Sequence, residues 1–154
     1  MQPAAKTRTE KVICLNKKAF HEFEILTKYD TGIVLQGTEV KALRMHRATI
    51  TESFARLKNG EVWLVNSNIP HYAHGNINNH EPTRTRKLLL GKKEIRKITD
   101  KLKDKSLTLV PLKLYFSGPF VKAEIAVAKG KKLHDKRESI KSADIKRQLS
   151  RVKI

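Results

Sequence analysis

Apolar residues alternate with polar ones along several stretches of this chain, which is the pattern of half-buried strands. Residues 23–35 alternate and then end in the apolar run GIVL. The strongest signal lies in residues 53–65, where Asn59-Gly60 separates two alternating runs and predicts a two-residue hairpin turn. Residues 107–116 and 120–128 predict two further strands, of which the second turns one face inward through Val121, Ala123, Ile125 and Val127.

Three segments show helical spacing instead of alternation. NKKAFHEF, residues 16–23, predicts a short helix with Asn16 as its N-cap. GTEVKALR, residues 37–44, predicts a second helix that Thr38 caps and that turns Val40 and Leu43 inward. Residues 91–105 predict a third helix with a basic outer face and a stripe formed by Ile95, Ile98 and Leu102.

Together these elements predict a mostly β fold: a small oligonucleotide-binding (OB-fold-like) β-barrel with two or three short helices. The number of strands alone leaves other small barrels open. We assign residues 12–128 to the barrel and residues 1–11, which are polar, to a flexible N-terminus. Residues 129–154 form a basic C-terminal tail.

The tail contains too few large apolar residues to pack onto the barrel. It carries ten Lys and Arg residues against three acids, a net charge of +7. Ile145, Leu149 and Val152 share one helical stripe, but like charges oppose an isolated helix of this length. We expect the tail to be disordered alone and helical when bound to a polyanion. The alternative is a dispensable solubilising tail.

The charge of the whole chain also indicates a polyanionic partner. The net charge is +18, from 33 Lys and Arg residues against 15 acids, and nucleic acid is the default partner of such a surface. An anionic membrane is disfavoured because it would need a strongly amphipathic basic helix with Trp, Phe or Leu along one face, and none stands out. No apolar run approaches the roughly 18 residues of a membrane span. Cys14 is the only cysteine, so we expect no disulfide and a reducing cytoplasm.

Catalytic and metal-binding signals are weak. His71, His74 and His80 lie in the loop of residues 70–83, but their spacing matches no standard zinc pattern, so we expect no metal and no cofactor.

A nuclease would need acids such as Asp30, Glu39 and Glu52 to meet in space, and nothing in the sequence indicates that they do. We therefore expect no enzymatic activity. Arg84 and Arg86 of RTRK instead predict a basic strand that follows a phosphate backbone, and a solvated basic rim is the alternative.

Four motifs occur in one order: GTEVK (37–41), PTRTRKLLL (82–90), LTLVPLKLYF (107–116) and AKGKKLHDKR (128–137). In this combination the chain resembles the SsrA-binding protein (small protein B) family, from about Leu15 to Arg137. The resemblance implies an RNA-binding barrel that binds the tRNA-like domain of transfer-messenger RNA and brings it to stalled ribosomes. It also implies trans-translation, in which the nascent peptide is tagged and the ribosome is rescued, with the protein and RNA together imitating a tRNA.

The resemblance also implies two sets of site residues. The transfer-messenger RNA surface corresponds to Asn16, Lys17, Asp30, Leu89 and Lys122, with Glu39, Lys41 and Arg44 as weaker candidates. The ribosome-binding tail, which would occupy the decoding centre and the empty mRNA channel of the small subunit, corresponds to Lys129, Lys131, Lys132, His134, Asp135, Lys136 and Arg137. A general ribosomal-RNA-binding or ribosome-assembly protein is the alternative. Nothing in the sequence indicates oligomerisation, so we expect a monomer.

Overall fold

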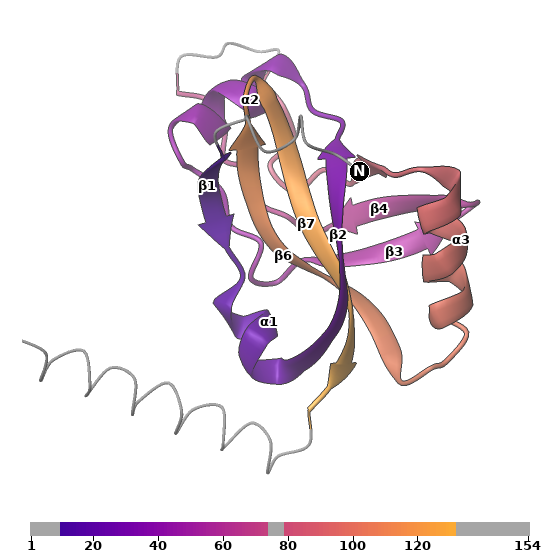
Figure 1. Cartoon of the computed structure of the whole chain (residues 1–154). Helices are drawn as coiled ribbons and strands as arrows, with labels where there is room; N and C mark the ends of the chain where they lie inside the picture. The colour runs from indigo at the N-terminus through magenta and orange to yellow at the C-terminus, as the bar shows by residue number, and fades with distance from the viewer. Residues whose placement is uncertain (1–9, 74–78, 132–154) are drawn as a thin grey trace, which may run out of the picture.

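The computed structural model describes residues 10–73 and 79–131 of the chain. Within them, seven strands and three helices follow one another along the chain (Figure 1). In chain order they are β1 (Glu10–Leu15), α1 (Lys17–Glu22), β2 (Phe23–Ile33), α2 (Gly37–Arg44), β3 (Phe54–Lys58), β4 (Glu61–Val65), β5 (Arg86–Leu89), α3 (Lys92–Lys101), β6 (Leu107–Ser117) and β7 (Phe120–Gly130).

The strands form one antiparallel sheet that closes on itself. Their order is β1-β6-β3-β4-β5-β2-β7, and β7 also pairs with β6, which completes a ring. Closure leaves β1 as a short extra strand on β6. Closing a sheet removes most of the exposed strand edges that would otherwise invite pairing with other chains. This architecture confirms the prediction of a small, mostly β barrel with two or three short helices, of which the described residues form three.

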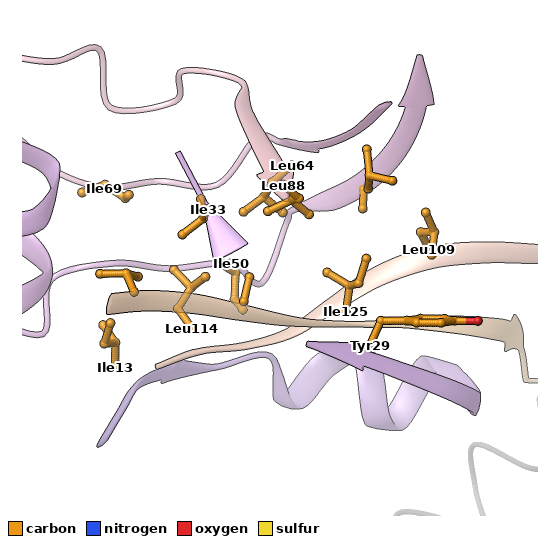
Figure 2. Packing of buried hydrophobic residues seen from close by; sticks show 14 of the residues in the cluster. Ile13, Tyr29, Ile33, Ile50, Leu64, Ile69, Leu88, Leu109, Leu114 and Ile125 are labelled. Atoms are coloured by element: carbon orange, nitrogen blue, oxygen red, sulfur yellow. The ribbon is translucent and has the colours of Figure 1, made fainter. Parts of the chain in front are cut away.

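The interior is filled by the inward faces of these strands. Figure 2 shows Leu64, Leu88, Leu114 and Ile125 within one cluster, and all four are essentially buried. A smaller second cluster lies under α1, where Ala19 packs against a patch of β6 and β7 formed by Val110, Leu112, Ala126 and Ala128. The small side chains of β7 in this patch leave room for the helix to approach the sheet.

The hairpin prediction is confirmed in detail. Asn59 and Gly60 connect β3 and β4, with φ angles of 54° and 72°. Positive φ at both central residues is the backbone that a type I′ turn requires, and Asn-Gly adopts it at low cost. The 11-residue strands β6 and β7 pair along nearly their whole length, joined by a turn at Gly118, which also has positive φ.

Two boundaries differ from the prediction. Glu10 and Lys11 begin β1 by pairing with β6, so they are not part of a loose N-terminus. At the other end, β7 continues through Lys129 to Gly130, because both β2 and β6 are long enough to pair with it there. The predicted states of residues 1–9 and of residues 132–154 lie outside the described residues.

Helix α2 is not capped by Thr38 as predicted. Its N-cap is Gln36, whose backbone N–H donates to the Glu39 carboxylate at 2.7 Å. The hydroxyl of Thr38 instead bonds the ring of His80. Leu43 faces the core as expected, while Val40 is only partly buried. Within residues 10–73 and 79–131, none of the helices is long and apolar enough to cross a membrane.

Candidate nucleic-acid interface

One row of residues crosses three neighbouring strands on the outside of the barrel. Leu89 of β5 lies opposite Gly32 of β2, and Gly32 lies opposite Lys122 of β7. Leu89 is 51% exposed, which is unusual for a leucine in a strand. A Cβ at Gly32 would lie 3.3 Å from the Cβ of Leu89, so the glycine gives the leucine room to lie across the sheet. We call this surface, with Asp30 beside it on β2, the RNA face, after the RNA contacts that the resemblance implies for Leu89, Lys122 and Asp30.

The RNA face contains an apolar groove of about 330 Å³. Leu89 and Lys122 line it together with Val40 and Phe120. Phe120 is 54% exposed and was not among the predicted site residues. Its only signal in the sequence is its position directly after the Ser-Gly-Pro turn, because aromatic residues seldom occur at solvent-exposed turns. Exposed apolar groups beside a cation are suited to an unstacked base and its phosphate.

Asp30 is held in place at the edge of the RNA face. The Tyr115 hydroxyl donates a hydrogen bond to Asp30 Oδ1 at 2.8 Å, and Lys113 Nζ lies 4.9 Å from the centre of the tyrosine ring. Burial raises the pKa of Tyr115, and the hydrogen bond to Asp30 raises it further, so the phenol stays protonated and keeps donating. The Asp30 side chain remains exposed and can accept a hydrogen bond from a base or a ribose.

Asn16 differs from the prediction because it is buried, with 3% of its surface exposed. Its Nδ2 donates to the Pro111 carbonyl at 2.9 Å, and its Oδ1 accepts from the Ala19 backbone N–H at 3.2 Å. Both polar atoms of the amide are therefore used to start α1 and to fix it on β6. A direct contact between Asn16 and RNA does not fit this geometry, whereas the neighbouring Lys17 is exposed.

Glu39 also differs from the prediction, because its side chain is fully buried in α2. Its carboxylate accepts from Arg84 at 2.6 Å and from Arg86 Nε at 2.6 Å. Burial alone would raise the pKa of Glu39, but the hydrogen bonds from Arg84, the Gln36 backbone and Arg86 outweigh it and lower that pKa. We call Glu39, Arg84 and Arg86 the buried charge cluster, and it leaves Glu39 no surface for RNA.

The same cluster corrects the prediction that Arg86 follows a phosphate backbone. Arg86 is 0% exposed, and its guanidinium also donates to the Ser67 hydroxyl at 2.8 Å and to the Pro82 carbonyl at 3.1 Å. These bonds tie β5 to α2 and to both ends of the long connection between β4 and β5. The RTRK motif therefore holds the barrel together at Arg86, while Arg84 is partly exposed at its edge.

The two remaining candidates of α2 are exposed. Lys41 Nζ lies 5.5 Å from the centre of the Tyr72 ring. Arg44 lines a basic groove of about 360 Å³ together with Lys11 and His46. That groove shares Pro119 with the groove of the RNA face, so Arg44 borders the RNA face at the end of the barrel.

His80 of the histidine loop has a structural role. His80 is 2% exposed, and its Nε2 lies 2.7 Å from the Ile69 carbonyl, which can only accept a hydrogen bond. Nε2 therefore carries the proton, and Nδ1 accepts from the Thr38 hydroxyl at 2.8 Å. His71 stacks edge-on against His80, and His74 lies outside the described residues. No metal-binding group of three such side chains occurs within residues 10–73 and 79–131.

The acids considered for a nuclease have separate partners. Asp30 accepts from Tyr115, Glu39 belongs to the buried charge cluster, and Glu52 pairs with Lys18 at 3.1 Å. The structure does not assemble these three into a shared carboxylate site.

Two of the predicted tail residues belong to the barrel. Lys129 lies in β7 opposite Glu24 and Leu107. The backbone N–H of Lys131 donates to the Glu22 carbonyl at 2.9 Å, and its Nζ donates to the Phe20 carbonyl at 3.0 Å. The chain therefore leaves the barrel beside the end of α1. The other predicted tail residues lie outside the described residues: Lys132, His134, Asp135, Lys136 and Arg137.

Comparisons with known proteins agree on one family. A family model described as SmpB protein matches residues 13–153. The SsrA-binding protein of Thermosipho africanus is 56% identical over 141 residues, which is 91% of this chain and 95% of the relative. The SsrA-binding protein of Carboxydothermus hydrogenoformans is 51% identical over 142 residues, which is 92% of this chain and 95% of the relative. A chain from the solved structure "tmRNA-SmpB: a journey to the center of the bacterial ribosome" is 44% identical with a TM-score of 0.67, and the match covers 82% of this chain and 93% of that one.

Proposed function

This chain belongs to the SmpB protein family, and from that membership we propose that it is an RNA-binding protein of trans-translation. It binds the tRNA-like domain of transfer-messenger RNA and delivers it to stalled ribosomes, so that the nascent peptide is tagged and the ribosome is freed. It acts by binding and catalyses no reaction of its own. Since both partners belong to the translation machinery, it works in the cytoplasm.

The observation that carries the proposal is the row of Leu89, Gly32 and Lys122 beside the apolar groove, with Leu89 exposed. A leucine that is half exposed in a strand has a cost in water, which a bound base would remove. Lys122 supplies a cation for a phosphate, and Asp30 supplies an acceptor for ribose or base. RNA with splayed bases therefore fits this face better than a flat protein surface would.

The proposal divides the work between two parts of the chain. The barrel holds transfer-messenger RNA on the RNA face, and the basic tail acts on the ribosome. Because Lys129 and Lys131 are fixed to the barrel, we place the functional start of the tail at Lys132. His134 and the cations around it then contact ribosomal RNA in the decoding centre and the mRNA channel, through stacking and phosphate contacts.

The RNA face is tested by Leu89→Ala and Lys122→Ala, measured by filter binding to the tRNA-like domain at several salt concentrations. Lys122→Ala should weaken binding and lower the salt slope by about 1, because one phosphate contact is lost. Leu89→Ala should weaken binding at unchanged slope. Arg96→Ala, on the exposed side of α3, is the matched control for lost surface charge. Equal affinities for all of these proteins would contradict the assignment of the RNA face.

The division of labour is tested by ending the chain after Lys131, so that β7 stays whole. The truncated protein should bind the tRNA-like domain with nearly normal affinity but fail to support peptide tagging on stalled ribosomes. Normal tagging by this truncation would refute the role of the tail. Crosslinking in cells, followed by sequencing of the bound RNA, should recover transfer-messenger RNA far above its abundance, whereas a general ribosome-assembly protein would recover ribosomal RNA alone.

A further inference from the structure

Trp63, the only tryptophan of the chain, lies on the outside of the barrel and does not fill the core. Trp63 is in the middle of β4, and its neighbours Val62 and Leu64 are the residues of this strand that point inward and are fully buried. Trp63 is not part of the hydrophobic core cluster within residues 10–73 and 79–131. A large aromatic side chain at such a position is available to a partner.

Cations flank Trp63 on both neighbouring strands. Arg56 of β3 lies directly opposite it on one side, and Lys87 of β5 lies opposite it on the other. Lys87 pairs with Glu61 at 3.1 Å. Arg56 and Lys58 take part in none of the ion pairs found in the described part of the chain, so their charges are available to an anion.

A hollow of about 420 Å³ lies over this row. Its lining residues include Trp63 and Val65, the two cations Arg56 and Lys58, and Thr85 just before β5. We call it the Trp63 hollow. Its volume falls in the range of roughly 300–1,000 Å³ that is common for ligand sites. An aromatic floor with cations at the rim is the combination with which proteins hold single-stranded nucleic acid, because bases stack on the ring and phosphates meet the cations.

The indole N–H of Trp63 adds a second observation. Its Nε1 is shielded from solvent and has no hydrogen-bond acceptor in residues 10–73 and 79–131. Buried donors without a partner are uncommon in proteins, and each calls for an explanation. A ligand rich in acceptor oxygens, such as RNA, would provide the missing partner once the side chains around the ring adjust.

The position of the Trp63 hollow indicates which RNA occupies it. Thr85 lines the hollow and Leu89 lines the groove of the RNA face, and the two residues are four positions apart on the outer side of one extended segment. That separation is about 13 Å, and Lys87 points outward between them. A single RNA molecule bound to the RNA face can therefore continue into the hollow.

We infer that the Trp63 hollow binds an unpaired nucleotide of the same transfer-messenger RNA, with its base stacked on the indole and its phosphates beside Arg56 and Lys58. This inference rests on the proposed function. It extends the RNA-binding surface from the β5–β2–β7 side of the barrel onto the β3–β4 hairpin, and it gives the unpaired cations of that hairpin a role.

Because Trp63 is the only tryptophan, its fluorescence reports on the hollow alone. The full-length protein is titrated with the tRNA-like domain, and separately with small ribosomal subunits, while filter binding of labelled RNA is measured in parallel. Stacking predicts that Trp63 emission is quenched along the filter-binding curve of the tRNA-like domain. Normal RNA binding without a change in emission would overturn the inference and leave the proposed function intact, whereas absent RNA binding would contradict the proposed function itself. A change produced by small subunits alone would also overturn the inference.

Variants supply a readout that does not depend on fluorescence. Trp63→Ala should weaken binding of the tRNA-like domain by fivefold to a hundredfold, on the order of one lost base stack, and Trp63→Phe should recover most of that loss. Arg56→Ala removes an exposed side chain without an ion pair, so the fold should persist, and the salt slope should fall by about 1. Arg96→Ala on α3 is again the control. The site would be refuted if Arg56→Ala, Trp63→Phe and Trp63→Ala all bound the tRNA-like domain like wild type. For Trp63→Ala, the affinity of the folded molecules is the one compared.

Discussion

Replacing Glu39 by alanine should destabilise the barrel strongly, because it removes the counter-ion of a fully buried arginine. Glu39 accepts hydrogen bonds from Arg84, Arg86 and the Gln36 backbone. Removing one partner of a buried ion pair costs about 3–5 kcal/mol. Arg86 keeps neutral acceptors, among them the Ser67 hydroxyl at 2.8 Å, so we expect a loss near the lower end, about 3 kcal/mol. Single domains are stable by only about 5–15 kcal/mol, so this loss should be easy to measure.

A paired replacement separates the ion pair from simple packing. Glu39→Leu with Arg86→Met exchanges both charges for apolar side chains of similar length. Well-packed apolar replacements of buried ion pairs are often neutral or stabilising. The double variant should therefore be more stable than the sum of the two single variants predicts, and a double-mutant cycle measures that difference.

Acid should weaken the wild-type protein through the same carboxylate. The folded-state pKa of Glu39 lies below its ordinary value of 4.5, because the hydrogen bonds of the cluster outweigh burial. The corresponding stability is present above the unfolded-state pKa and is lost as pH falls through the folded-state pKa. The unfolding free energy of wild type should therefore drop more below about pH 4.5 than that of Glu39→Gln.

Urea unfolding followed by circular dichroism gives these free energies, and filter binding under folding conditions gives RNA affinity. The buried position predicts that the folded fraction of Glu39→Gln binds RNA normally. A Glu39→Ala protein whose unfolding free energy stays within about 1 kcal/mol of wild type but whose RNA affinity falls would refute the structural role and restore Glu39 as a contact residue.

Two further predictions concern a buried amide and a partly buried thiol at the C-terminal end of β1. Asn16→Ala should lower the unfolding free energy by about 1–2 kcal/mol, since it removes the N-cap of α1 and the hydrogen bond to Pro111. An Asn16→Ala protein that unfolds in urea like wild type but binds RNA more weakly would contradict this. Burial raises the pKa of the Cys14 thiol to about 11, against a smaller opposing effect of a hydrogen bond to the Leu114 backbone. Iodoacetamide at pH 8 should therefore react about a hundredfold more slowly than with free cysteine, and a rate within tenfold would show that the site opens readily.

Local signals in the sequence predicted the elements whose structure depends on residues close to one another in the chain. Asn59-Gly60 alone specifies its hairpin turn, because few other pairs tolerate positive φ at both positions. Ile98 marks the buried side of α3. The strand at residues 10–15 was missed because its alternation is short and begins with two charged residues, and only the length of β6 provides it with a partner.

The site was harder to predict where burial decides the role of a polar residue. Arg86 and Glu39 are 47 positions apart, so the sequence does not show that each neutralises the other inside the protein. Family resemblance likewise named Asn16 without separating a residue that contacts RNA from one that holds a helix. Leu89 and Lys122 stay predictions as RNA contacts, whereas Phe120 and the groove that it shares with them emerge only from the pairing of β2 with β5 and β7.

The length of the β6–β7 hairpin also restricts how the sequences of such proteins can evolve. Lys122 lies near its turn, and Gly130 lies at the opposite end of the barrel, where the chain departs beside α1 (Figure 1). Eight residues of strand separate them, about 26 Å. The length of the hairpin thus sets the distance between the bound RNA and the origin of the tail. Substitutions along it can be absorbed one at a time, whereas inserting two residues in each strand would move the origin of the tail by about 7 Å and also shift the pairing of β7 with β2. Selection on this hairpin should therefore act on its length more strictly than on its composition.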